Sequence, residues 1–162
     1  MCGRYDFFRN FESLRRHFKT LEIDSFELNP FTAYPSGQYP VITKNGLQHM
    51  TWGFLPEWAD KGSKPQINAR VETARQKPYF KKACQIGRCL IPANRFTEWE
   101  SAGEKIPHQF ELEANECFAG IYEQNRFCIL TKPAESGIAR IHDRMPFIVK
   151  ATAGERWLLY AR

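Results

Sequence analysis

A chain of 162 residues, 43% of them hydrophobic, has the size of one globular domain. Such a chain buries about 70% of the surface that its unfolded form exposes, so its core needs neither a metal ion nor disulfide bonds. The net charge of +5, from 23 Lys and Arg against 18 acidic residues, suits a phosphate-rich partner, although many soluble proteins are mildly basic. We find no apolar run near the ~20 residues of a membrane span and no signal peptide.

The five cysteines form no recognisable pairing framework. An odd number of scattered cysteines is typical of a reducing cytosol, and the chain has no C-x-x-C pair that would indicate a structural zinc ion. Cys117 and Cys128 lie in apolar segments, so we expect them to pack as small core residues. We therefore predict a cytoplasmic protein without a metal site.

The first half of the chain predicts one short helix and one hairpin. Apolar residues at helical spacing follow a suitable N-cap Asn, which predicts an amphipathic helix over 10–18. Prolines break up residues 24–40, so an irregular segment is expected there. Strand-like segments at 41–43 and 48–52 flank the turn signal at 44–46 and predict a β-hairpin.

The second half predicts an α+β arrangement. A helical run after residue 70 stops before Pro78, which suits the first turn of the next helix. The later elements that we expect are strands at 88–92, 95–100, 108–113, 117–122 and 126–131, a short helix at 134–140, a strand at 147–149 and a terminal helix at 155–159. Residues 1–162 are therefore expected to form one domain with a curved, barrel-like, mostly antiparallel sheet flanked by short helices.

The second residue carries the most distinctive chemistry. If the initiator Met1 is removed, Cys2 bears an α-amine and a thiol on adjacent carbons. The amine can condense with an aldehyde to a Schiff base, and the sulfur can then close a five-membered thiazolidine ring. A cysteine at position 2 also occurs by chance, so this residue alone decides nothing.

Two further residues have both a catalytic and an ordinary interpretation. Strand alternation places Glu98 on the face of Phe96, so it is either an edge-strand charge or a carboxylate in a partly dry site that can transfer protons. His142 lies at a loop-to-strand junction, where a lone histidine is usually a structural hydrogen-bonding residue.

A second group suits the binding of nucleic acid. Asn68 and Arg70, two apart in an extended segment, would point the same way and line a groove, unless Arg70 simply forms a surface salt bridge with Glu72. Phe54 and Trp58 lie in a loop, and exposed loop aromatics stack on bases at about 1–3 kcal/mol per base. Trp52, in contrast, is expected in the core.

Seven segments occur in a characteristic order along the whole chain. They are Met1-Cys2-Gly3-Arg4, Trp52-Gly53-Phe54, Ile67-Asn68-Ala69-Arg70-Val71-Glu72-Thr73, Arg88-Cys89-Leu90-Ile91-Pro92, Phe96-Thr97-Glu98-Trp99, Phe118-Ala119-Gly120-Ile121-Tyr122 and His142-Asp143-Arg144-Met145-Pro146. With these segments the sequence resembles the SOS response-associated peptidase (SRAP) family, the abasic-site shielding proteins.

The resemblance implies a reaction and a reactive set. Proteins similar to this one bind single-stranded DNA, or single-strand/double-strand junctions, at abasic sites and cross-link to the opened sugar, with some lyase activity. By match of motif, Cys2 would be the nucleophile and Asn68 would orient its amine or the sugar. Glu98 would act as general acid and base, and His142 would assist opening of the sugar ring.

The same resemblance implies how DNA is held. Arg4 and Arg70 would bind phosphates, and Trp58 would keep the kinked strand open. Phe54 and Thr131 complete the DNA-binding set that we predict. The expected partner is single-stranded DNA with an abasic site, no cofactor is implied, and a monomer is expected in the cytoplasm of a bacterium or a phage-infected cell, on the nucleoid when bound to DNA.

Two departures from the family pattern bear on DNA shape preference. Thr32 stands where the family usually has an Asn, and Ala59 follows Trp58 where some members have a second Trp. The reactive set of four residues is intact. Two other functions stay open at this point, a cysteine peptidase that processes its own Met1 and a single-strand binder that forms no covalent bond.

Overall fold

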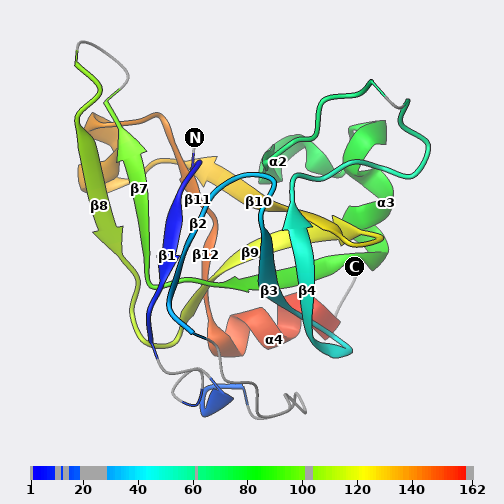
Figure 1. The fold of residues 1–162 in the computed structure, drawn as a ribbon, viewed down its shortest axis with the longest axis horizontal. Coiled ribbons are helices and arrows are strands. Elements are labelled where there is room, and N and C mark those ends of the chain that lie inside the picture. Colours follow the sequence, from blue (N-terminus) through cyan, green and yellow to red (C-terminus); the bar gives the residue numbers. More distant parts are fainter. Residues whose placement is uncertain are drawn as a thin grey trace.

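The computed structural model describes residues 2–9, 12, 15–18, 29–60, 62–100 and 104–159, which form a fold rich in β-strands (Figure 1). The strands are β1 (Tyr5–Phe7), β2 (Phe31–Ala33), β3 (Gln38–Thr43), β4 (Gly46–Trp52), β5 (Asn68–Arg70), β6 (Arg88–Pro92), β7 (Arg95–Trp99), β8 (Pro107–Glu111), β9 (Glu116–Glu123), β10 (Arg126–Pro133), β11 (Arg144–Pro146) and β12 (Ile148–Lys150). The helices are α2 (Val71–Ala74), α3 (Pro78–Ile86) and α4 (Ala151–Leu159), together with the 3-10 helix η1 (Ser136–Arg140).

These strands form two sheets. The smaller, four-stranded sheet has the order β2-β1-β7-β8 and is antiparallel. The larger sheet runs β11-β10-β4-β3-β6-β9-β12, with β5 beside β10. Because β10 also pairs with β9, the strands β10, β4, β3, β6 and β9 close into a ring. Among the described pairings, those of β4 and β5 with β10 are parallel and the others antiparallel, so the predicted curved and mostly antiparallel sheet is confirmed.

The main core lies between the ring and the smaller sheet. It contains residues of both, including Tyr5 of β1 and Phe118 of β9, whose rings meet edge to face with centroids 5.8 Å apart. Trp52 is fully buried, as predicted, and its Nε1–H donates to the Ile67 carbonyl at 2.9 Å. Burial of aromatic rings of this size dominates the energetics of such a core.

Close backbone approach explains one glycine in the ring. Gly120 of β9 pairs with Cys89 of β6 and with Ile129 of β10. A Cβ atom at this position would lie 2.7 Å from the Cys128 carbonyl oxygen, and would also collide with the Ile91 side chain. A residue without a side chain is therefore required where β9 crosses between its two neighbours.

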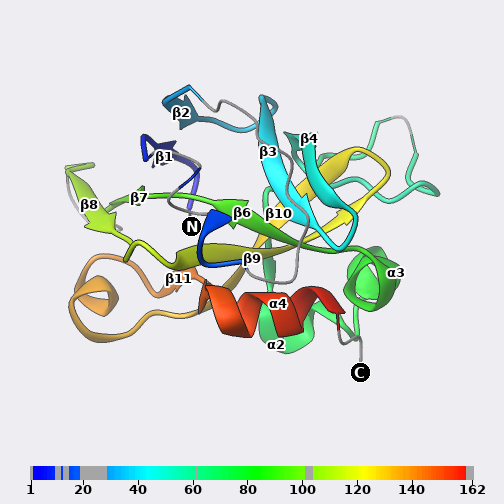
Figure 2. The same ribbon diagram turned by 90° about the horizontal axis from the view of Figure 1, so that it is seen from below.

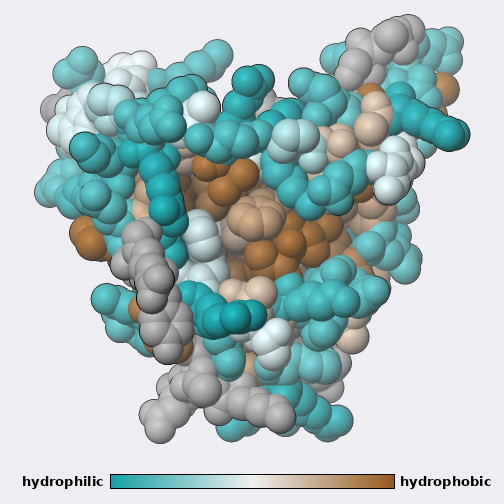
Figure 3. Space-filling view, turned by 180° about the vertical axis from the view of Figure 1, so that it is seen from behind, coloured by the Kyte–Doolittle hydropathy of each residue, from teal (hydrophilic) through white to brown (hydrophobic). Residues whose placement is uncertain are grey.

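The helices cover one face of the larger sheet. Figure 2 shows α2 and α4 on one side of the ring, with β1 and β2 on the other. The cover is incomplete, because an apolar hollow opens on the face seen in Figure 3. A cavity of about 440 Å³ is lined there by Val71, Ala74, Arg75, Cys84, Leu130, Phe147 and Trp157. No helix within the described ranges is long and apolar enough to cross a membrane.

Most of the longer predicted elements are confirmed. The hairpin at 41–52 forms as β3 and β4, with Gly46 at a φ of 98° after the turn. The five strands predicted between residues 88 and 131 are observed as β6 to β10. Cys117 and Cys128 are 1% and 0% exposed, so both are core residues as expected.

Other expectations need correction. The three-residue strands β1, β2, β5 and β11 were not predicted as strands, because so short a segment shows no alternation of its own and is fixed by its partners. The expected helix at 134–140 is the 3-10 helix η1, and the terminal helix begins at Ala151 rather than at residue 155. The helix predicted over 10–18 lies largely outside the described residues.

Candidate active site

Cys2 is held at the start of the smaller sheet, immediately before β1. Its side chain is 0% exposed, and its carbonyl oxygen accepts a hydrogen bond from Asn68 Nδ2 at 2.9 Å. The other amide atom, Asn68 Oδ1, is buried and has no hydrogen-bond partner among the described residues. Since buried polar atoms are normally paired, the site holds a hydrogen-bond acceptor beside Cys2 that is ready for a donor.

Strand pairing brings Glu98 to the same place. The Arg4 carbonyl accepts hydrogen bonds from the Thr97 amide at 3.1 Å and from Cys2 Sγ at 3.7 Å, which aligns the chain before β1 with β7. Glu98 is 1% exposed, and β7 lies between β1 and β8. The interpretation of Glu98 as an edge-strand charge is therefore wrong.

Burial raises the pKa of both groups. Burial raises the pKa of the Cys2 thiol far above its ordinary value, and the negative charge of Glu98 raises it further. Burial also raises the pKa of the Glu98 carboxyl, although the positive charge of His142 opposes this shift. A carboxyl group with a raised pKa can both give and accept a proton at a higher pH than an ordinary carboxyl group.

His142 precedes β11, and its side chain is 17% exposed. The Arg144 backbone N–H donates to His142 Nδ1 at 3.0 Å, and Asp143 Oδ1 lies 2.9 Å from the same nitrogen. An N–H always presents a hydrogen whereas a carboxylate only accepts, so the contact with Arg144 needs an unprotonated Nδ1 and the contact with Asp143 needs a proton on Nδ1. The structure thus brings Cys2, Asn68, Glu98 and His142 together, and the roles that the resemblance implies for them stay predictions.

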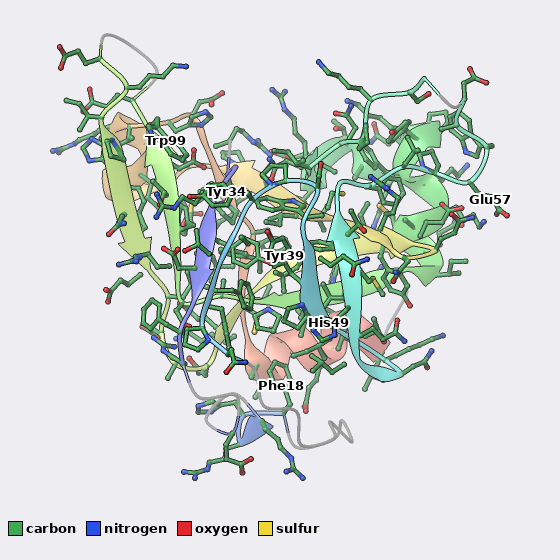
Figure 4. The ribbon with its side chains drawn as sticks, viewed as in Figure 1. Phe18, Tyr34, Tyr39, His49, Glu57 and Trp99 are labelled. Atoms are coloured by element: carbon green, nitrogen blue, oxygen red, sulfur yellow. The ribbon has the colours of Figure 1, made fainter. Side chains whose placement is uncertain are left out.

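The predicted DNA-binding residues differ in their accessibility. Trp58 is 64% exposed and touches Tyr79 only edge to face, with centroids 6.0 Å apart. Arg70 is exposed, and the Arg4 guanidinium lies 5.8 Å from the centre of the Tyr34 ring. Figure 4 shows Tyr34 at the end of the smaller sheet from which Cys2 extends, and Trp99 at the same end of β7.

Two predicted DNA contacts are wrong because the residues are buried. Phe54 is 0% exposed, and its ring packs against those of Tyr79 and Phe80 at 5.8 and 5.5 Å. Thr131 is also 0% exposed, and its hydroxyl meets the Ala69 carbonyl and the Arg144 guanidinium at 3.5 and 3.2 Å. The loop position of Phe54 suggested exposure, but the loop folds its apolar side chain inward.

The sequence did not identify one ion pair beside the site. The suggested partner of Glu72 was Arg70, yet Glu72 instead accepts two hydrogen bonds from Arg144, at 2.6 and 2.9 Å. These bonds lower the pKa of the Glu72 carboxyl to about 2. The two partners are 72 positions apart, so only the motif around His142 drew attention to Arg144.

Thr32, the departure from the family pattern, has a local partner. Its hydroxyl donates to Asp6 Oδ1 at 2.7 Å, and Arg95 Nε donates to the other carboxylate oxygen at 2.9 Å. Burial raises the pKa of Asp6, but these two hydrogen bonds and the charges of Arg95 and Arg4 together outweigh it, so the pKa is lowered. Within the described part of the chain, no group of three or more His, Cys, Asp or Glu could hold a metal ion.

Comparisons with known proteins all indicate the same family. A family model described as SOS response associated peptidase (SRAP) matches residues 1–162. The abasic site processing protein YoqW of Bacillus subtilis is 35% identical over 98% of this chain and 80% of its own length. YedK of Escherichia coli, also an abasic site processing protein, is 30% identical over 98% of this chain and 79% of its own length.

Solved structures share the fold. A protein from Bacteroides thetaiotaomicron superposes with a TM-score of 0.79 at 24% identity, over 97% of this chain and 81% of that one. A phage-related protein from Bordetella bronchiseptica gives a TM-score of 0.77 at 23% identity, over 97% and 81% of the two chains. The family model, the relatives and the fold agree, and the chain belongs to the SOS response associated peptidase family.

Proposed function

We propose that, after loss of Met1, this protein senses abasic sites in single-stranded DNA and shields them by a covalent thiazolidine cross-link to Cys2. The observation that carries the proposal is the buried contact of Cys2 with Asn68 beside the Glu98 carboxyl, in a chain whose relatives are abasic site processing proteins. Such a protein would act in the cytoplasm, as a monomer, wherever damaged DNA is exposed.

The reaction balances without a cofactor. The Cys2 amine attacks the aldehyde carbon of the opened sugar, and the resulting carbinolamine loses water to form a Schiff base. The Cys2 sulfur then bonds to the same carbon while the imine nitrogen takes up a proton, and the thiol gives up its own. The products are the thiazolidine and one water molecule.

Glu98 has the properties that these proton transfers need. Its raised pKa lets it protonate the departing hydroxyl group and take a proton from the amine or thiol afterwards. Because the Cys2 thiol has a strongly raised pKa, it stays protonated until a base is close, and Glu98 is the nearby carboxylate. A Schiff base that is not captured by sulfur can undergo β-elimination, which accounts for a lyase side activity.

Asn68 and His142 would prepare the reactants. The unused Oδ1 of Asn68 can accept a hydrogen bond from the Cys2 amine once that amine is free. His142 lies close enough to Glu98 to influence the pKa of that carboxyl, so the imidazole would assist opening of the sugar ring from beside Glu98. Arg4 and Arg70 would bind the flanking phosphates, and the exposed Trp58 would hold the strand open.

The test is covalent capture. Purified protein whose mass shows that Met1 is absent should give an adduct with abasic single-stranded DNA that survives denaturation, whereas undamaged DNA should give none. Cys2→Ala should abolish the stable adduct and retain salt-sensitive DNA binding. A stable adduct formed by Cys2→Ala at the original rate would rule out the thiazolidine.

A peptide-cleavage assay and a DNA-binding assay on the same protein distinguish the two other functions. Turnover of an unrelated peptide that depends on Cys2 would indicate a cysteine peptidase. Such an enzyme needs a thiolate, and the raised pKa of the Cys2 thiol works against one. Salt-sensitive binding without any adduct, from protein that has lost Met1, would indicate a single-strand binder.

A further inference from the structure

The Arg144 side chain joins three segments of the chain next to the proposed site. Arg144 begins β11, and its guanidinium donates to both carboxylate oxygens of Glu72, in α2, at 2.6 and 2.9 Å. Its Nη2 also donates to the Thr131 carbonyl in β10, at 2.6 Å. The Arg144 side chain is 8% exposed and that of Glu72 is 41% exposed, so the charge-assisted pair is buried on the arginine side and reaches solvent at the carboxylate.

Two of these segments lead to a residue of the proposed site, and the third, β10, lies between them. Glu72 follows β5, which begins with Asn68, and β5 pairs with β10 through Arg70 and Thr131. On its other edge β10 pairs with β11, where Pro146 is opposite Thr131. The Glu72–Arg144 pair therefore bridges the strand that carries Asn68 and the strand that follows His142.

The backbone of Arg144 acts directly on the imidazole. Its N–H donates to His142 Nδ1 at 3.0 Å, so a neutral ring in this arrangement must carry its proton on Nε2. Displacement of Arg144 would move this donor away from the ring and remove the preference between the two tautomers. The competing neighbour is Asp143, whose Oδ1 lies 2.9 Å from Nδ1 and favours a proton there.

We propose that Glu72 and Arg144 are positioning residues, which hold the His142 ring in its Nε2–H tautomer and fix its place relative to Asn68. Neither residue needs to touch DNA for this role, because the Arg144 guanidinium is already bonded to Glu72 and Thr131. The kinetic part of this inference rests on the proposed function, whereas the tautomer does not.

The first measurement is the NMR spectrum of the His142 ring in ¹⁵N-labelled protein without DNA. At a pH where the ring is neutral, the nitrogen shifts should show a protonated Nε2 and an unprotonated Nδ1. Glu72→Gln, which replaces one acceptor by a donor at nearly constant size, should shift the population toward Nδ1–H. Wild-type protein with the neutral proton on Nδ1 would overturn the inference, whether or not any adduct forms.

The second measurement is the rate of adduct formation at saturating abasic DNA. Glu72→Ala should slow it about tenfold to a hundredfold, since small displacements of a catalytic group have costs of that order, and should change the half-saturating DNA concentration less than twofold. Glu72→Asp should recover part of the rate. Glu113→Ala, which removes an exposed pair with Lys150 at 3.3 Å, is the matched control and should keep the full rate.

A double-mutant cycle distinguishes positioning from a general structural effect. In a His142→Ala background, Glu72→Ala should slow the reaction less than twofold further, because its effect is transmitted through the ring. An equal loss in both backgrounds would overturn the proposal. If wild-type protein without Met1 formed no adduct, the proposed function would fail, and the NMR measurement would still decide the tautomer.

Discussion

Glu98 and Cys2 are almost completely buried, and the negative charge of Glu98 helps to raise the pKa of the Cys2 thiol. The raised pKa of Glu98 is mainly an effect of burial, which disfavours the charged form of any carboxyl group. The same burial that suits Glu98 for proton transfer therefore makes its charge unfavourable for the folded state.

Glu98→Gln should accordingly lower the rate of adduct formation and raise the stability of the fold. The variant keeps the shape of the side chain but cannot transfer a proton, so adduct formation should slow about 100-fold or more while DNA affinity stays within twofold. Single-turnover rates and a binding titration measure the two quantities. Equal losses in rate and affinity would mean that Glu98 has only a structural role.

The effect on stability has a defined pH dependence. The pKa of Glu98 is higher in the folded protein than its ordinary value of 4.5, so the folded form binds the proton more tightly. The contribution of Glu98 to stability is present below pH 4.5 and is lost as the pH rises through the raised pKa. Glu98→Gln should therefore be the more stable protein at pH 7, and the difference should vanish toward pH 4 in denaturant titrations.

The individual residues show what the sequence could and could not provide. Cys2, Asn68, Glu98 and His142 were predicted from short motifs, and the structure brings them together. The partner of Glu72 could not be predicted, because a salt bridge across 72 positions depends on how β10 separates β5 from β11. Burial of Phe54 was missed for a related reason, since a loop has no periodicity that tells which side chain points inward.

At the scale of elements, the loop between β4 and β5 presents one aromatic ring and buries another. Trp58 is 64% exposed and Phe54 is 0% exposed, although they are four positions apart. Tyr79 of α3 contacts both rings, so the loop packs against this helix through Tyr79. The long strands around this loop were predictable from alternation, whereas the three-residue strands take their geometry from their neighbours.

Two substitutions in this loop should have opposite effects. Trp58→Ala should weaken binding to abasic single-stranded DNA by about 1–3 kcal/mol and leave the unfolding free energy nearly unchanged. Phe54→Ala should lower the unfolding free energy by about 3–5 kcal/mol, because it removes a fully buried ring. Fluorescence binding titrations and urea unfolding of both variants provide the comparison, and a Trp58→Ala protein with unchanged affinity would exclude the stacking role.

At the scale of the whole molecule, the fold depends on β10, which pairs with β4, β5, β9 and β11. These pairings close the ring. They also hold β5, which begins with Asn68, and β11, which follows His142, on the two sides of β10. A curved, barrel-like sheet was predicted, but the identity of the strands that close the ring was not, because it depends on pairings between distant segments.

The net charge of +5 should appear in the salt dependence of DNA binding. Each phosphate neutralised on a single strand contributes about −0.7 to the slope of log K against log salt concentration. Arg70→Ala should make the slope less steep by about 0.7, because it removes one phosphate contact. Arg156→Ala, an exposed change on α4, is the control and should keep the slope, and identical slopes for wild type and Arg70→Ala would exclude that contact.

Burial of Cys2 also limits when another enzyme can reach this residue during synthesis and folding. Residue 2 is enclosed by β5 and β7, which are synthesised long after it, and no part of it is exposed once they have paired. An aminopeptidase that needs access to Cys2 would therefore have to act before β5 and β7 pair around this residue. If Met1 is removed as proposed, its removal would precede this pairing or would be carried out by the assembled site.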